Sequence, residues 1–233
     1  MTSGMTQKQI ELHEDAIELY KDVRDKPWLA QGMLEQGYDD AAWAVGQSLF
    51  NTARTLAEAR DTAFATQLGA TDAFNRLFDQ SWPYFLLLMQ NCVKLFQGQA
   101  EWLRLLGLHE ARLNGNGTSQ ISKPGKNDND ELTLAWLDKF YSVARTHPEM
   151  SAILAKNNFS AAKLDRDANR VKALREANRR QDEAIAARKQ AVKDRNAAFR
   201  AFKPWLRRAQ KVAAIVKKEH EAQQEAAAVS IEL

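Results

Sequence analysis

The sequence predicts an all-α protein, from its composition and from the scarcity of helix-breaking residues. Ala, Leu, Glu, Lys, Arg and Gln dominate the 233 residues, and these residues lose little conformational freedom in a helix. Only ten glycines and five prolines interrupt the chain. Because 45% of the residues are hydrophobic, a chain of this length can bury a substantial core. We therefore expect long helices that pack on one another.

The chain contains an internal repeat. Shifting the sequence against itself by about 121 residues aligns several distinctive residues. The aligned pairs are Tyr20 with Tyr141, Arg24 with Arg145, Pro27 with Pro148, Phe78 with Phe199, and Pro83 with Pro204. Apolar residues spaced alternately three and four apart, as in a coiled-coil seam, keep their register across this offset. Both seams are polar near the middle and apolar toward the C-terminal end, which indicates a duplication.

Each copy is expected to begin with one short helix, about 9–24 and about 131–145. These helices should end at Pro27 and Pro148, because proline disfavours helix in the residue before it. A connector should follow each of them.

A very long helix completes each copy, about 38–106 and about 159–228. Pro83 and Pro204 should kink these helices, since proline removes a backbone hydrogen bond. Gly107 is a candidate stop for the first one. The expected architecture is two tandem repeats packed as an elongated coiled-coil-like bundle.

The repeats suggest a division into a first repeat at 1–106, a polar linker loop at 107–131 and a second repeat at 132–233. The linker is rich in Gly, Asn, Ser, Pro and Asp, which are typical of loops. Its NGNGTS segment from Asn114 is interpreted as a turn, because no strand precedes it and no GK[ST] follows. We expect the two repeats to form one integrated domain.

The most apolar segment surrounds Pro83. The run from Trp82 to Val93 includes Gln90 and Asn91, and it is shorter than the roughly 20 apolar residues of a membrane-spanning helix. The start of the chain lacks the apolar core of a secretion signal, and a single cysteine, Cys92, cannot form an internal disulfide. The expected compartment is the cytoplasm, with Cys92 as a small buried hydrophobe.

The apolar residues around both prolines are candidates for the core or for self-association, with conditional entry into a membrane as a less favoured alternative. The candidates are Trp82, Tyr84, Phe85, Leu88, Phe78, Phe199, Phe202, Trp205 and Leu206, with Leu86, Leu87 and Met89 as further residues expected to be buried.

No motif indicates catalysis. The four histidines are scattered, and HExxH and paired CxxC motifs are absent. We therefore expect no catalytic residues, metal, cofactor or small-molecule substrate. The carboxylates of the first helix, Glu11, Glu14, Asp15 and Glu18, are interpreted as a solvated face.

Charge is distributed unevenly. Residues 1–106 carry about 9 basic and 14 acidic residues, whereas residues 163–218 carry about 18 basic and 6 acidic ones. The candidate residues for binding a partner are Arg175, Arg179, Arg180, Arg188, Lys189, Arg207 and Arg208. Neutralisation by the acidic first repeat, within the chain or between subunits, is the favoured interpretation. Nucleic acid and an anionic membrane are the alternatives.

The stretch VKDRNAAFRAFKPWLRRAQKVAAIV, from Val192, resembles the C-terminal helix of a loosely defined group of uncharacterised bacterial helical proteins. The matching residues are Asp194, Arg195, Ala198, Phe202, Trp205, Ala213 and Ile215. Lys203 and Pro204 depart from that pattern, which has an unbroken, more acidic approach to the tryptophan. The resemblance covers about a tenth of the chain and implies a long-helix fold without an assigned activity.

Together these features favour a non-enzymatic structural or scaffolding protein that self-assembles into an oligomer or filament through the aromatic-rich faces near the prolines. A nucleic-acid-associated bundle that uses the basic second long helix is the alternative. A membrane-active, toxin-like bundle is a further alternative.

Overall fold

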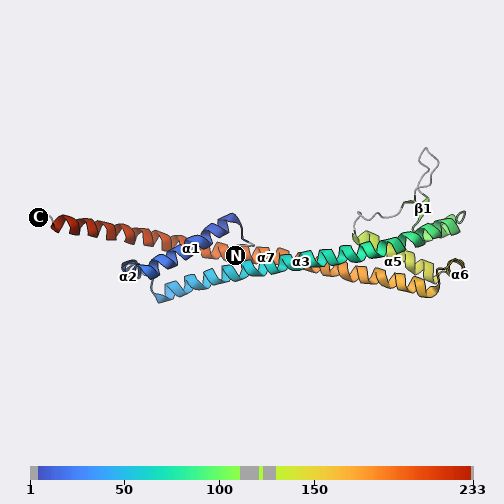
Figure 1. The fold of residues 1–233 in the computed structure, drawn as a ribbon, viewed down its shortest axis with the longest axis horizontal. Coiled ribbons are helices and arrows are strands. Elements are labelled where there is room, and N and C mark those ends of the chain that lie inside the picture. Colours follow the sequence, from blue (N-terminus) through green and yellow to red (C-terminus); the bar gives the residue numbers. More distant parts are fainter. Residues whose placement is uncertain (1–4, 111–120, 123–129, 232–233) are drawn as a thin grey trace, which may run out of the picture. The chain divides into compact units, whose positions relative to one another are not determined.

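A computed structural model describes residues 5–110, 121–122 and 130–231. Nearly all of this part of the chain is helical, which confirms the all-α class (Figure 1). The helices are α1 (Gln7–Asp25), α2 (Pro27–Glu35), α3 (Asp40–Leu95), α4 (Ala100–Leu105), α5 (Asp130–Thr146), α6 (Pro148–Lys156) and α7 (Ala161–Ile231).

Two short strands lie in the linker between α4 and α5. The strands β1 (His109–Glu110) and β2 (Ile121–Ser122) pair antiparallel, with His109 opposite Ser122. Residues 111–120 and 123–129 lie outside the described residues, and so does the predicted turn at Asn114.

The prediction of one short helix before each long helix is wrong, because two precede each: α1 and α2 before α3, and α5 and α6 before α7. The predicted ends are confirmed, since α1 ends at Asp25, α5 ends at Thr146, and Lys26 and His147 are extended. The prolines that follow are the first residues of α2 and α6. Proline is favoured there because its missing N–H would have no partner in the first helical turn. The predicted connectors are therefore largely helical.

The first long helix is shorter than predicted. It ends at Leu95, and Gly98 then adopts a φ of +88° that favours glycine. Gly107, with a φ of +70°, follows the separate helix α4. Pro83 and Pro204 lie inside the continuous helices α3 and α7, and the kinks expected there stay predictions.

The repeat is visible in the helix boundaries. The offset that relates Pro27 to Pro148 also relates the last residue of α2 to that of α6, and the first residue of α3 to that of α7. Buried residues follow the same offset, since Phe78 and Phe199 are both buried.

The chain forms two compact units, each of which takes helices from both repeats. Unit 1 comprises residues 1–66 and 186–233, and therefore contains α1, α2, the first part of α3 and the last part of α7. Its α3 and α7 segments are antiparallel: Trp43 lies against Trp205, and Phe50, farther along α3, lies against Phe202.

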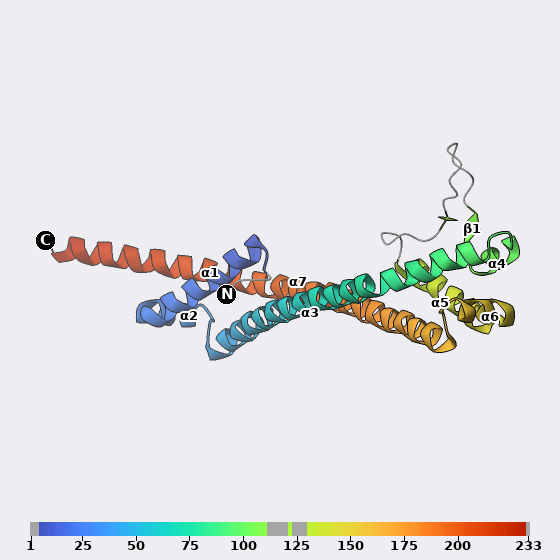
Figure 2. The ribbon, with the colours of Figure 1, turned by 45° about the vertical axis from the view of Figure 1, so that its right-hand side comes forward.

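Unit 2 comprises residues 67–185 and contains the rest of α3, α4, the two strands, α5, α6 and the first part of α7. Here too the α3 and α7 segments are antiparallel, because Thr71 pairs with Gln181 whereas Tyr84 lies against Arg170. Figure 2 shows α5 and α6 near the last turns of α3 and the first turns of α7.

The combination of helices from both repeats in each unit explains why each seam becomes apolar toward its C-terminal end. The apolar end of α3 packs against α5, where the rings of Phe85 and Tyr141 are 5.7 Å apart. The apolar end of α7 packs against α1, where the rings of Trp205 and Tyr20 are 6.2 Å apart. Each long helix thus supplies its apolar end to the short helices of the other repeat.

Candidate interaction surface

Most aromatic candidates are part of the chain's own cores. Phe78, Phe85 and Leu88 are buried in unit 2, and Phe199, Phe202 and Leu206 are buried in unit 1. Trp82 stacks on Phe78 with ring centroids 5.1 Å apart, and Trp82 and Trp205 are half-buried. Because these side chains pack within the chain, they do not form an exposed aromatic face.

Tyr84 and Leu87 differ from the expectation of burial. They are 45% and 47% exposed, because α3 turns Phe85, Leu88 and Met89 inward instead. The ring of Tyr84 still has a partner, since the Arg170 guanidinium lies 3.8 Å from its centroid. Such a cation–π contact stabilises the pair without removing it from solvent.

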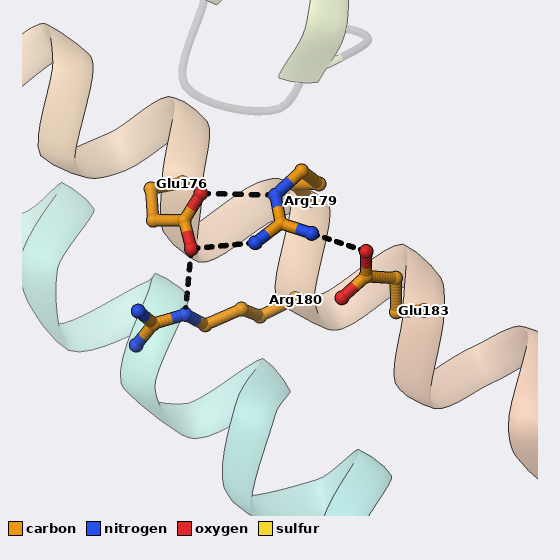
Figure 3. Close-up of polar contacts among 4 residues, drawn as sticks. All are labelled: Glu176, Arg179, Arg180 and Glu183. Atoms are coloured by element: carbon orange, nitrogen blue, oxygen red, sulfur yellow. Dashed lines mark hydrogen bonds and ion pairs between the residues drawn. The ribbon is translucent and has the colours of Figure 1, made fainter.

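Three of the predicted partner-binding arginines already have acidic partners in unit 2. The Arg179 guanidinium pairs with Glu176 at 2.7 Å and also with Glu183, and Arg180 pairs with Glu176 at 2.9 Å (Figure 3). Arg175 pairs with Asp138 of α5 at 2.8 Å. These carboxylates come from the second repeat, whereas the sequence pointed to the acidic first repeat as their source.

The pairing has an electrostatic consequence at Glu176. Hydrogen bonds from Arg179 and Arg180 lower the pKa of this carboxyl to about 2. The pKa of Arg179 is raised, first by its hydrogen bond to Glu176. Glu176 therefore remains charged and offsets these guanidinium charges at neutral pH.

Arg188 and Arg195 lie closer to the interior of unit 1. The Arg188 guanidinium lies 4.6 Å from the centroid of the Phe64 ring. Arg195 is buried and donates to Asn196 at 3.0 Å. Burial and the nearby charge of Arg60 lower the pKa of Arg195, while Asp61 of the first repeat opposes that shift.

The remaining candidates, Lys189, Arg207 and Arg208, are exposed, and none forms an ion pair with the described residues. Seven more basic residues of α7 lie between residues 189 and 218, where Asp194 is the only acidic residue. Arg207, Arg208 and Lys211 line a shallow pocket of about 470 Å³ together with Gln210 and Ala214.

Most of these cations share one face of the helix. With 3.6 residues per turn, separations of three, four, seven and eleven residues return to the same side. We call the following set the basic stripe: Lys189, Lys193, Arg200, Lys203, Arg207, Lys211 and Lys218. It runs about 44 Å at 1.5 Å per residue, on the side of α7 opposite to the buried Phe202, Leu206 and Ala209.

A second charged face lies on α1, also in unit 1. Its residues Glu11, Glu14, Asp15 and Glu18, which we call the acidic face, are exposed as predicted, whereas Ala16 and Leu19 are buried. None of the four carboxylates forms an ion pair within the described part of the chain. Unit 1 therefore exposes two faces of opposite charge.

Cys92 is buried in unit 2, as predicted, and burial raises its thiol pKa to about 12. Among the described residues, no three His, Cys, Asp or Glu side chains are grouped to hold a metal ion. Within the same residues, no helix has the length and apolar character needed to cross a membrane.

Among protein-family models, curated proteins and solved structures, none matches this chain. The charged faces of unit 1 therefore provide the basis for a functional proposal. The basic stripe could have been recognised from the sequence. It was not, because its residues were considered together with the paired arginines of unit 2, and the whole set does not lie on one face of the helix. A helical projection limited to residues 189–218 would have revealed it.

Proposed function

We propose that this protein is a non-enzymatic, cytoplasmic helical scaffold that assembles with further copies of itself. The observation that carries the proposal is the exposure, on one unit, of the acidic face of α1 and the basic stripe of α7. The acidic face of one copy then docks on the basic stripe of the next. Contact between two different faces of identical chains builds rings or filaments.

The charged faces replace the aromatic faces as the proposed contact. Phe85 and Phe202, next to the two prolines, are fully buried within the chain, so exposing them to a second copy would cost core packing. Single exposed ion pairs contribute only about 0–1 kcal/mol each. Assembly should therefore need several pairs at once and should weaken as salt screens them.

A charge exchange tests this proposal. The variant E14K/D15K/E18K should be monomeric in low salt, because both of its faces are then basic. The variant K203E/R207E/K211E should also be monomeric, because its acidic face on α1 is unchanged and its basic stripe then carries three glutamates that repel that face. A mixture of the two variants should assemble, and so should one chain that carries all six substitutions.

Light scattering over a range of salt and protein concentrations measures assembly, and electron microscopy distinguishes rings from filaments. A wild-type protein that stays monomeric at high concentration and low salt would overturn the proposal. The same conclusion follows if both charge-reversed variants assemble as the wild type does.

A further inference from the structure

The basic stripe carries more charge than the proposed assembly contact uses. The acidic face has four carboxylates between Glu11 and Glu18, a length of about 10 Å at the helical rise. The basic stripe has seven cations over about 44 Å. A docked copy would cover only part of this length, and unpaired cations would remain along α7.

We propose that the basic stripe binds the phosphate backbone of a nucleic-acid duplex, a function that goes beyond self-assembly. The stripe needs little rearrangement for this, because six of its cations are exposed, Lys203 is half-buried, and none of the seven forms an ion pair within the described residues. Arg175, Arg179 and Arg180 are different, since a phosphate would have to compete there with Asp138, Glu176 and Glu183.

The geometry favours a duplex over a single strand. A duplex is straight over tens of ångströms, since its persistence length is about 150 base pairs, and it presents about one negative charge per 1.7 Å of axis. Proteins that bind single strands stack bases on aromatic rings. The stripe has no aromatic member, and the neighbouring Trp205 is packed against Trp43 and Tyr20.

The same face is poorly suited to a lipid surface. A helix that binds at a membrane interface buries an apolar face beside its cations. Ala197, Ala201 and Ala214 lie beside the stripe, and Ile215 is the one large apolar side chain that is exposed between residues 189 and 218. Binding should therefore depend on charge alone and should not discriminate between base sequences.

Fluorescence anisotropy with a labelled 30-base-pair DNA duplex of arbitrary sequence tests the inference. Each phosphate contact contributes about 0.9 to the slope of log affinity against log salt. The variant K203E/R207E/K211E should bind on the order of 100-fold more weakly at 50 mM salt, and its slope should be smaller by about 3. The matched control R175E/R179E/R180E changes the net charge equally and should stay within about threefold of the wild type.

Circular dichroism establishes that both variants remain helical. If either reversal unfolds the chain, glutamine at the same three positions provides the comparison. The variant E14K/D15K/E18K separates the two functions, because it should lose self-assembly but retain duplex binding.

The inference is overturned if the wild type fails to bind the duplex at low salt, or if the control loses as much affinity as the stripe variant. Tighter binding to the corresponding single strand, or binding to phosphatidylserine-containing vesicles without duplex binding, would overturn it as well.

Discussion

The indole of Trp205 lies against the backbone of Gly46, so closely that a Cβ at position 46 would be 2.0 Å from the ring. The same indole donates its Nε1 hydrogen to the Ala42 carbonyl at 3.2 Å. This contact fixes the distance between α3 and α7 in unit 1. At the corresponding position of the second repeat, Asp167 pairs with Arg170 at 2.6 Å instead.

Gly46→Ala should destabilise the protein. Alanine improves helix propensity by about 1 kcal/mol, but overpacking against the indole costs about 1–3 kcal/mol. Urea unfolding measures the difference. Gly69→Ala is the control, because nothing lies within 4 Å of its added methyl group, and it should stabilise by about 0.5–1 kcal/mol. Equal effects of the two substitutions would contradict the close approach.

Leu88→Ala and Leu87→Ala should have different effects although they are adjacent. Leu88 is fully buried, so truncation leaves a cavity and should cost about 2–5 kcal/mol. Leu87 is 47% exposed, and its truncation should cost less than about 0.5 kcal/mol. Thermal or urea unfolding measures both. A larger loss for Leu87 would mean that α3 presents another face to its core.

Asp22 links α1 to α7 and should make stability depend on pH. Its carboxylate accepts from Lys217 at 2.6 Å and from Lys26 at 2.7 Å, and these hydrogen bonds lower its pKa below the ordinary 3.8. The stabilisation is therefore present above pH 3.8 and is lost as the pH falls through the lowered value. Asp22→Asn should reduce the free energy of unfolding at pH 7 and have a smaller effect in acid.

Asp25→Asn is the control for that comparison. Asp25 is exposed and pairs with the adjacent Arg24, a contact that does not join two helices. Urea unfolding between pH 2 and pH 7 measures both variants. Equal losses at all pH values would show that Asp22 does not act through its charge.

Cys92 should not react with a thiol reagent in the folded protein. Its side chain is fully buried, and a pKa of about 12 keeps the thiol protonated at pH 8. The thiolate is the reactive form. Full reaction is expected in urea, and the rate in buffer should report the opening of unit 2. Prompt and complete reaction in buffer would contradict the burial of Cys92.

Sequence patterns were reliable where structure depends on neighbours along the chain. Pro27 and Pro148 marked the ends of the first helices, and the conserved offset located the start of both long helices. The patterns failed where two outcomes have similar local signals. A proline can both end one helix and open the next. Gly98 and Gly107 both adopt a positive φ, so the sequence did not distinguish Gly98, which follows α3, from Gly107, which follows α4.

The candidate surface was only partly predictable for a similar reason. Lys189, Arg207 and Arg208 were among the predicted partner-binding residues, but so were Arg175, Arg179 and Arg180, which have acidic partners in the folded chain. Net charge counts both groups alike. Arg175 owes its partner to α5, which only folding brings near.

By itself, the sequence determined the helical class, the duplication and the positions of the prolines, because helix propensity and apolar periodicity are properties of short stretches of chain. Only the tertiary structure decided that each long helix gives its apolar end to the short helices of the other repeat, and that the cations of the basic stripe form no ion pairs within the described residues. Packing and charge neutralisation depend on residues that are distant in sequence, such as Tyr20 with Trp205 and Asp22 with Lys217.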